Sequence, residues 1–374
     1  MSPKTTFTHI KAFCLREATL CISGLAAAIS CFFVPVSRDY LHYFDWRTLA
    51  LLYCLMVVVS GFCQAGLFNW LAHKLCLKAS NARAMGCVLV ALCFFSSMLI
   101  TNDVALLTFV PFALIVLGLA HCERELIIVI VLQTVAANLG SLLTPVGNPQ
   151  NLFLHSYYNI SNAFFFSTTL PVWIASLLIL TACCLALIPP HKVTADLGEC
   201  PALNKRALPL YALLFAVCLL VVFRWMSWQY MVAIMVALLM VTQRRQLLRA
   251  DFFLLLTFGF FFVFSGNLAN IPQVHNALCQ VLRDHAYWVS LAVSQVISNV
   301  PAALLLSGFT ADAKSLLLGV NIGGLGTPVA SLASLISLKL YSASPRPQTW
   351  RFLKVFAYVN IGLLAVLSLV FAPR

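Results

Sequence analysis

One polar pattern, interrupted by glycine and proline, occurs twice in otherwise very apolar sequence. The first copy reads SMLITNDVALL from Ser97 and NLGSLLTPVGNPQNL from Asn138, and the second reads SQVISNVPAAL from Ser294 and NIGGLGTPVASLASL from Asn321. The longer segments are identical at seven of fifteen aligned positions, where chance would give about one. Such a duplicated, interrupted segment is typical of secondary transporters built from internal repeats.

Composition limits the class of protein. Of the 374 residues, 62% are hydrophobic and only 9% are charged, whereas a soluble domain has about 25% charged residues. We therefore expect a polytopic membrane protein. The net charge of +12 comes from basic residues scattered singly between apolar runs, which argues against a nucleic acid partner. The fourteen cysteines show no metal-ligand spacing, so we expect small buried hydrophobes and no disulfides.

The apolar runs predict the fold class. Two stretches, 84–118 and 286–309, carry polar residues at their midpoints, so that each half is short and a re-entrant hairpin is expected. We predict an all-α polytopic membrane protein with two inverted repeats, each with a re-entrant hairpin and a discontinuous transmembrane helix. About nine crossings plus two hairpins are expected. The crossing runs lie near 19–36, 47–68, 125–166, 169–189, 208–223, 228–243, 252–267, 314–341 and 352–372, with 125–166 and 314–341 interrupted.

The distribution of basic residues predicts the topology. With the N-terminus in the cytoplasm, 17 of the 23 Lys and Arg residues fall on the cytoplasmic side and the C-terminus lies outside. The two hairpins then enter from opposite sides, which makes the repeats inverted. We expect a multi-pass protein of the bacterial inner membrane. Its predicted parts are a cytoplasmic segment (1–18), the first repeat (19–190), a cytoplasmic loop with a linking span (191–226) and the inverted second repeat (227–374).

Both long segments should unwind inside the membrane. Pro145, Gly147 and Pro149 cannot all sit in a regular helix, since proline removes an N–H donor and clashes with the preceding turn. Unwinding leaves N–H groups that suit an anion and carbonyl groups that suit a cation. The alternative is that these polar side chains only hold helices together, at about 0.6 kcal/mol each. Their recurrence in register favours a binding site. The polar groups at the breaks are Thr144, Asn148, Gln150 and Asn151 in the first copy, and Asn321, Thr327, Ser331 and Ser334 in the second.

Asp103 is the only acidic residue in either repeated core, and Val300 replaces it in the second copy. A carboxylate within the bilayer is costly and indicates a sodium ligand or a proton carrier. It could also cap the helix that follows it. The two roles are compatible, and both stay open at this stage.

The segments ITNDVALLTFVPF (100–112), GSLLTPVGNPQNLF (140–153) and SQVISNVP (294–301) resemble the ion transporter superfamily, which includes arsenite permeases, NhaD-type antiporters and citrate transporters. Within it, the sequence is most similar to the YbiR-type inner-membrane proteins. The resemblance implies that hairpin tips and broken helices meet around a substrate and its coupling ions. Where the dicarboxylate symporters have Ser-Asn-Thr at both tips, this sequence has Thr-Asn-Asp and Ser-Asn-Val, which favours the arsenite and antiporter branch.

These observations give two transport hypotheses, and a third alternative is a membrane-embedded enzyme or assembly scaffold, which would require the duplicated breaks to be purely structural. The first is a secondary active transporter of an inorganic or small organic anion, coupled to Na⁺ or H⁺. The second is a Na⁺/H⁺ antiporter with Asp103 as the cation and proton site. Neither is an enzyme, and the sequence lacks the GxSxG and HExxH motifs of catalytic sites.

The expected partners are the lipid bilayer, a small anion and a coupling cation, with no cofactor beyond that ion; a homodimer is left open. The predicted substrate and ion site consists of Thr101, Asn102, Asp103, Asn138, Thr144, Gly147, Asn148, Asn151, Ser298, Asn299, Asn321, Gly324, Gly326 and Thr327, with Na⁺ expected at Thr101, Asn102, Asp103, Ser298 and Asn299.

Overall fold

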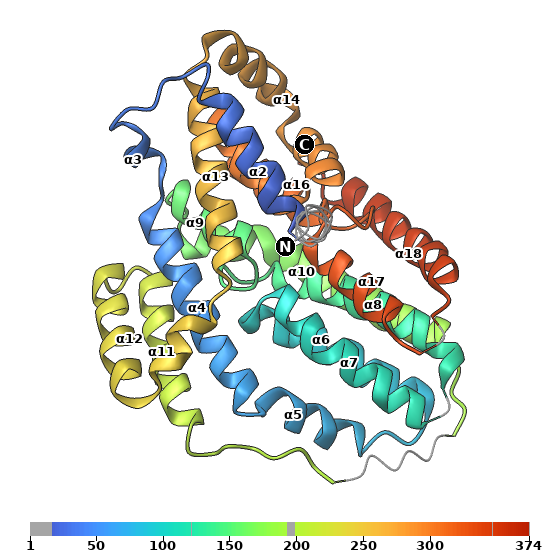
Figure 1. The fold of residues 1–374 in the computed structure, drawn as a ribbon. Helices are drawn as coiled ribbons and strands as arrows, with labels where there is room; N and C mark the ends of the chain where they lie inside the picture. The colour runs from blue at the N-terminus through green and yellow to red at the C-terminus, as the bar shows by residue number, and fades with distance from the viewer. Residues whose placement is uncertain (1–16, 121, 193–198, 346, 374) are drawn as a thin grey trace, which may run out of the picture.

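The computed structural model describes residues 17–120, 122–192, 199–345 and 347–373 (Figure 1). These residues form helices, with one isolated β-bridge between Asn81 and Lys192. The chain is an all-helical polytopic membrane protein, since seven of the described helices are long and apolar enough to cross a bilayer. They are α4 (Trp46–Gln64), α6 (Ala82–Ile100), α7 (Asn102–Leu119), α8 (Glu123–Ser141), α10 (Asn162–Leu187), α13 (Phe252–Ala269) and α18 (Thr349–Val370).

Further helices complete the described part of the chain. α4 and α13 each begin with a capping aspartate, because Asp45 accepts from the Thr48 N–H and Asp251 from the Leu254 N–H, both at 3.0 Å. The long helix α14 is kinked at His285. The remaining elements are α2 (Ala18–Ser30), α3 (Tyr40–Tyr43), α5 (Leu67–Cys76), α9 (Pro149–Tyr157), α11 (Leu208–Val222), α12 (Trp228–Thr242), η1 (Arg244–Arg249), α14 (Pro272–Ile297), α15 (Asn299–Leu306), η2 (Ser307–Phe309), α16 (Ala313–Ile322) and α17 (Leu332–Ser342).

The arms of the first expected hairpin are longer than the sequence suggests. α6 and α7 run side by side and meet at Thr101 (Figure 1). They contain 19 and 18 residues, which at 1.5 Å per residue gives each about 28 Å, close to the hydrocarbon thickness. The expectation of two short arms is therefore wrong for this pair. In the second copy both arms are short, since the part of α14 beyond its kink at His285 covers only 286–297 and α15 has eight residues.

The two helix breaks fall where proline and glycine predict them. α8 ends at Ser141 and α9 begins at Pro149, the first helical position, where proline is tolerated. In the second copy α16 ends at Ile322 and α17 begins at Leu332. The residue before each restart caps the new helix: Asn148 Oδ1 accepts from the Asn151 N–H, and Ser331 Oγ from the Ala333 N–H.

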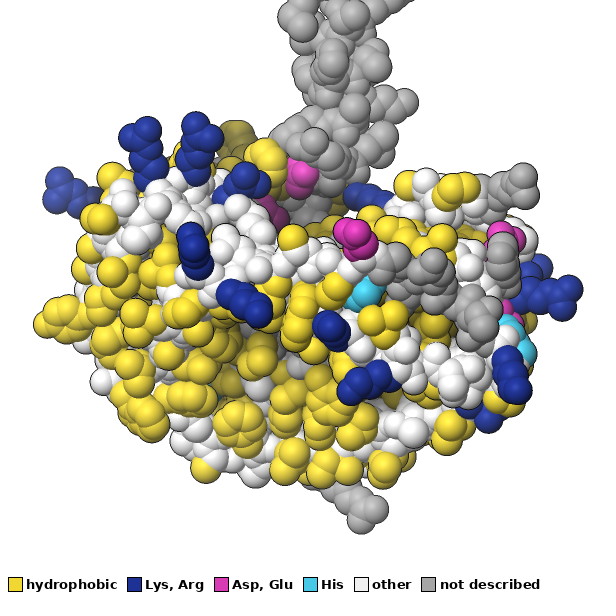
Figure 2. All heavy atoms as spheres, turned by 90° about the horizontal axis from the view of Figure 1, so that it is seen from below, with side chains coloured by type: hydrophobic (Ala, Val, Ile, Leu, Met, Phe, Trp, Pro, Cys, Tyr) yellow, Lys and Arg dark blue, Asp and Glu magenta, His cyan; other side chains and the backbone are white. Residues whose placement is uncertain are grey.

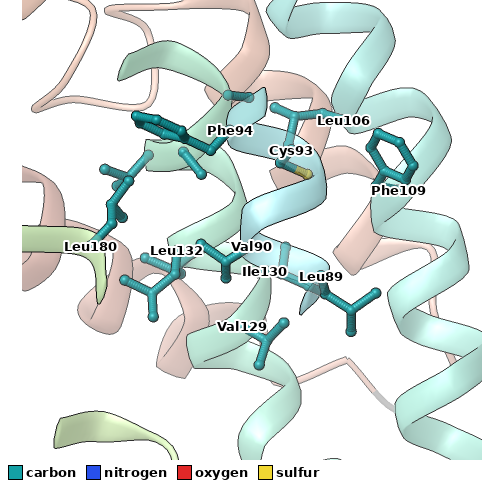
Figure 3. Packing of buried hydrophobic residues seen from close by; sticks show 14 of the residues in the cluster. Leu89, Val90, Cys93, Phe94, Leu106, Phe109, Val129, Ile130, Leu132 and Leu180 are labelled. Atoms are coloured by element: carbon teal, nitrogen blue, oxygen red, sulfur yellow. The ribbon is translucent and has the colours of Figure 1, made fainter. Parts of the chain in front are cut away.

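The buried hydrophobic residues form two clusters that separate the halves of the broken helices. The first cluster contains the buried hydrophobic residues of α6, α7, α8 and α17, and the second contains those of α9, α11 and α13 and most of those of α4. The buried hydrophobic residues of α16 are divided between the two clusters. Figure 3 shows the first cluster, in which Phe94 of α6, Phe109 of α7 and Ile130 of α8 are labelled. Across the breaks, α8 packs against α17 and α9 against α16. The first half of each broken helix thus meets the second half of the other.

The outer surface suits a lipid environment. Large hydrophobic side chains such as Leu178, Val241 and Tyr358 are more than half exposed. Figure 2 shows hydrophobic side chains across much of the face seen from below, with Lys and Arg side chains spread among them. By contrast, α8 is central, because every residue from Val129 to Ser141 is buried.

Candidate functional site

A buried cluster of amides joins the first break to the second broken helix. Asn148 donates from Nδ2 to Asn321 Oδ1 across 3.2 Å. Asn321 in turn donates from its own Nδ2 to Asn151 Oδ1 across 2.6 Å. All three side chains are buried, with at most 4% exposed. In the apolar interior such amides require partners, and here they find them in each other.

A matching hydrogen bond joins the second break to the first broken helix. Ser331 Oγ donates to Asn138 Oδ1 across 2.9 Å, and Asn102 Nδ2 donates to the same oxygen across 3.0 Å. In the sequence alignment Asn138 is the counterpart of Asn321, and Ser331 is the counterpart of Asn148. The same contact is therefore made twice with the two copies exchanged, as two-fold related units do.

The two polar tips have the same backbone conformation. Thr101 has φ 67° and ψ 151°, and Ser298 has φ 77° and ψ 155°. A positive φ is uncommon for residues other than glycine. Each tip also docks in the same way: the Asn102 N–H donates to the Gly147 carbonyl at 3.2 Å, and the Asn299 N–H donates to the Ala330 carbonyl at 2.9 Å. Gly147 and Ala330 are aligned, so the docking recurs in register.

The two break threonines make equivalent contacts with their own hairpins. Thr144 Oγ1 donates to the carbonyl of Met98, and Thr327 Oγ1 donates to the carbonyl of Gln295. Gln295 also donates from Nε2 to the carbonyls of Gly323 (2.7 Å) and Leu325 (2.9 Å). The sequence comparison missed Gln295 because its counterpart, Met98, is apolar and gives no repeated signal.

Close packing explains two of the predicted glycines. A Cβ on Gly147 would lie 2.1 Å from the carbonyl oxygen of Ser141. Gly326 has φ +102°, and its Cβ would lie 2.2 Å from Gln295 Oε1. A side chain at either position would therefore push the break loop away from its partners.

Asp103 does not cap α7 through its buried oxygen. Oδ1 has no hydrogen-bond partner in the described part of the chain. The N–H of Asp103 itself donates to Asn102 Oδ1 at 3.0 Å. The capping alternative is therefore wrong for this oxygen, and a carboxylate oxygen that is buried without a donor is costly.

The structure unites only part of the predicted site. The contacts form two groups, one of Asn102, Asn138 and the Gly324 carbonyl, which accepts from Asn138 Nδ2 at 3.5 Å, and one of Asn148, Asn151 and Asn321. Ser141 joins the two groups, because its Oγ accepts from Asn148 Nδ2 at 3.1 Å and donates to the Asn138 carbonyl at 2.9 Å. Asn299 lies against the same glycine, because a Cβ on Gly324 would be 2.8 Å from Asn299 Nδ2. Among the described residues, the Ser298 side chain bonds to its neighbour, with Oγ donating to Asn299 Oδ1 at 3.4 Å. Thr144 and Thr327 face their own hairpins rather than each other.

Two further buried polar residues hold helices together. Gln133 donates from Nε2 to the carbonyls of Leu89 and Phe109, each at 3.3 Å, and so links α8 to α6 and α7. Thr134 donates to Ser337 at 2.8 Å and links α8 to α17. These residues lie outside the duplicated segments, and their contacts are those of helix packing.

The candidate site offers neutral donors and acceptors. Side-chain amide and hydroxyl groups, together with the backbone N–H groups at the helix restarts, can bind an oxyanion, and the loop carbonyls can bind a cation. Their present partners are one another, so a substrate must replace these bonds as it enters.

Comparison with known proteins adds independent information. The model of the citrate transporter family matches residues 10–315. The uncharacterized transporter MJ0456 of Methanocaldococcus jannaschii is 32% identical over 339 residues, which cover 88% of this chain and 90% of that protein. The inner membrane protein YbiR of Escherichia coli is 31% identical over 325 residues, 86% of each chain. The silicon efflux transporter LSI3 of Oryza sativa subsp. japonica is 33% identical over 156 residues, 41% of this chain and 31% of that protein.

Proposed function

The chain belongs to the citrate transporter family, and on this premise we propose that it is a secondary active transporter. It moves a small inorganic or organic anion across the membrane and uses a gradient of Na⁺ or H⁺. Membership of the family and the similarity over most of the chain to an uncharacterized transporter and to an inner membrane protein support a membrane transporter. The class of substrate and the coupling ion are what we propose in addition to this.

One observation carries the proposal, namely the pair of exchanged contacts Asn148–Asn321 and Ser331–Asn138. Helix packing alone gives no reason for both breaks to meet each other through side chains that correspond in sequence. A substrate site at the junction of two repeats does give a reason, because both halves must contribute to it and both must be able to move. The inverted arrangement of the repeats is part of this proposal.

The residues at the junction indicate a small substrate. Anion binding here relies on neutral amides, hydroxyls and backbone N–H groups, and neither repeated core contains Lys or Arg. Neutral donors suit an ion of low charge better than a multivalent one, since no fixed cation offsets the loss of hydration. The family is named for citrate, and the relative from rice is named for silicon efflux. The ligands to be tested for binding therefore include oxyanions and weak oxyacids as well as carboxylates.

Asp103 favours a second candidate, a Na⁺/H⁺ antiporter. Its Oδ1 is buried without a donor among the described residues, so the carboxylate can take either a proton or Na⁺ as its partner. In the leading proposal the same group holds the coupling cation. The two candidates differ in whether an anion moves as well.

Thermal stabilisation tests the proposal. The purified full-length protein is heated in detergent with citrate, succinate, phosphate, sulfate, arsenite or silicate, each in NaCl and in choline chloride. A ligand that binds the folded state raises the unfolding temperature by mass action. We expect one of these compounds to stabilise the wild type and to lose this effect in the Asn321→Ala variant.

Two other outcomes separate the candidates. Stabilisation by NaCl alone, with no further shift from any of the anions, would support the antiporter. Equal stabilisation of wild type and Asn321→Ala by the same anion would show that the anion binds elsewhere, and would contradict the proposed site.

A further inference from the structure

Three potential metal ligands lie together at the end of α8 that is farthest from its break. Cys122 immediately precedes α8, Glu125 lies in its first turn, and His191 follows α10. Cys122 Sγ is 3.5 Å from His191 Nε2, and Glu125 Oε1 is 3.9 Å from His191 Nδ1. One donor atom from each residue can be chosen so that all three lie within 4.8 Å of one another. Spacing in the sequence gives no sign of this group, because Cys122 and His191 are 69 residues apart.

The backbone holds both sides of this group in place. The Cys122 N–H donates to the Leu117 carbonyl at 2.8 Å, which closes the corner between α7 and α8. On the other side, the Ala82 N–H donates to the His191 carbonyl at 3.0 Å. Arg83 Nε donates to the Ile188 carbonyl at 2.7 Å and fixes the end of α10. The three donors are thus positioned by bonds that do not depend on an ion.

The spacing and the chemistry of the donors suit zinc. In a tetrahedral zinc site with bonds of about 2.0–2.3 Å, neighbouring ligand atoms lie about 3.3–3.8 Å apart. The Cys122–His191 Nε2 separation falls within this range. Glu125 lies nearer to Nδ1, so its carboxylate must move toward the Nε2 side of the ring to bind the same ion. A thiolate, an imidazole and a carboxylate are ligands that zinc and similar transition metals accept, whereas Mg²⁺ and Ca²⁺ prefer oxygen.

A surface cavity gives access to this group of ligands. Cys122 is fully buried and Glu125 is 7% exposed, whereas the His191 side chain is 45% exposed. Glu125 and His191 line a surface cavity of about 610 Å³ together with Glu123, Arg124 and Pro189. An ion can enter from this cavity, and a water molecule can supply the fourth ligand.

A thiol beside an imidazole that in turn contacts a carboxylate is also the arrangement of catalytic cysteines. The contacts of Cys122 do not suit a nucleophile. The Cys122 sulfur has no exposed surface, and it donates to the Ala120 carbonyl at 3.4 Å. Burial, with a smaller effect of the Glu125 carboxylate, raises the pKa of the Cys122 thiol, which disfavours the reactive thiolate. A bound cation has the opposite influence and stabilises the thiolate as a ligand.

We propose that Cys122, Glu125 and His191 form a binding site for a zinc-like divalent transition metal. The ion would join the start of α8 to the end of α10. The other end of α8 carries Asn138 and Ser141, so the metal would restrain the helix that leads to the first break. This proposal does not depend on the identity of the transported substrate.

Cobalt provides the test, because a Co²⁺–thiolate bond gives a charge-transfer absorption band that reports cysteine ligation directly. The full-length protein, without a histidine tag, is stripped of metal with a chelator and titrated with Co²⁺ and then with Zn²⁺. We expect one equivalent of Co²⁺ to produce the band and Zn²⁺ to remove it. We expect Cys122→Ser to abolish the band, and His191→Ala or Glu125→Gln to weaken binding by about tenfold or more.

Matched variants control for chance binding. Cys200→Ser removes an exposed thiol and His42→Ala an exposed histidine, and neither should change the titration. His191→Ala keeps the test decisive if Cys122→Ser does not fold, because His191 is partly exposed. The absence of a band in wild type would overturn the proposal, as would a band that survives Cys122→Ser or an affinity that His191→Ala leaves unchanged.

Discussion

Asn148 in the first break donates a 3.2 Å hydrogen bond to Asn321, which lies just before the second break. Its sequence counterpart, Ser331, donates a 2.9 Å hydrogen bond to Asn138, the counterpart of Asn321. The two copies thus hold each other by the same contact made in both directions. A change at one contact should affect both halves of the site.

The first prediction concerns the stability of the Asn148–Asn321 contact. Asn148→Ala removes the donor to Asn321 Oδ1, and Asn321→Ala removes the donor to Asn151 Oδ1. Because each change leaves a buried oxygen without a partner, we expect each to lower the free energy of unfolding by about 1–3 kcal/mol. The double variant should lose less than the sum, with a coupling of about 0.6–1.7 kcal/mol. Reversible unfolding in mixed micelles gives these values.

Gln133→Leu is the control for that cycle. Gln133 is fully buried, but its Oε1 has no partner in the described residues, and its Nε2 bonds are 3.3 Å long. Replacing the amide by an apolar group of similar size should cost less than about 1 kcal/mol. Fully additive losses in the Asn148 and Asn321 variants would contradict a direct contact between the two side chains.

The second prediction compares two glycines. Gly147→Ala places a Cβ 2.1 Å from the Ser141 carbonyl oxygen, so the break loop must move. We expect a loss of stability of about 1–3 kcal/mol and loss of ligand-induced stabilisation. Gly118, near the end of α7, has no described atom within 4 Å of the position that a Cβ would take. Gly118→Ala should therefore be neutral or stabilise the helix by up to about 1 kcal/mol. Thermal unfolding of both variants checks this. An equal change of unfolding temperature in Gly147→Ala and Gly118→Ala would argue against a tightly packed break.

The sequence predicted the breaks better than the hairpins. Proline interrupts a helix and clustered glycines weaken it, so the ends of α8 and α16 follow from local chemistry. The length of α6 and α7 did not follow, because a polar midpoint such as Thr101 marks a turn without showing how far each arm extends. Similarly, a residue that is identical in the two copies is expected to have a similar environment in both. The alignment does not show which side chain will be its hydrogen-bond partner.

The rest of the site depended on tertiary contacts. Gln295 bonds three backbone groups of the second break, yet it has the apolar counterpart Met98, so comparison of the copies could not find it. Cys122 and His191 come together only because the end of α10 packs beside the α7–α8 corner. The predicted membership of the ion transporter superfamily is confirmed by the match to the citrate transporter family.

The third prediction concerns Asp103. Asp103→Asn keeps the size of the side chain but removes the charge that offsets a desolvated Na⁺ or accepts a proton. We expect ion-driven transport to fall by at least about tenfold, which corresponds to about 1.4 kcal/mol, while the protein stays folded. Uptake at several Na⁺ concentrations and pH values measures this. Wild-type ion dependence in Asp103→Asn would remove Asp103 from the mechanism and, with it, the main support for the antiporter.

The fourth prediction tests the central claim that the junction of the two breaks is the site of transport. The purified protein is reconstituted into liposomes, and uptake of the radiolabelled anion that stabilises it best is driven by an inward Na⁺ or H⁺ gradient. Wild type and Gln133→Leu should concentrate the anion equally, and Asn321→Ala should stay at the level of empty liposomes although it is folded and inserted. Uptake by folded Asn321→Ala at the wild-type rate would contradict the account and return these amides to a role in helix packing.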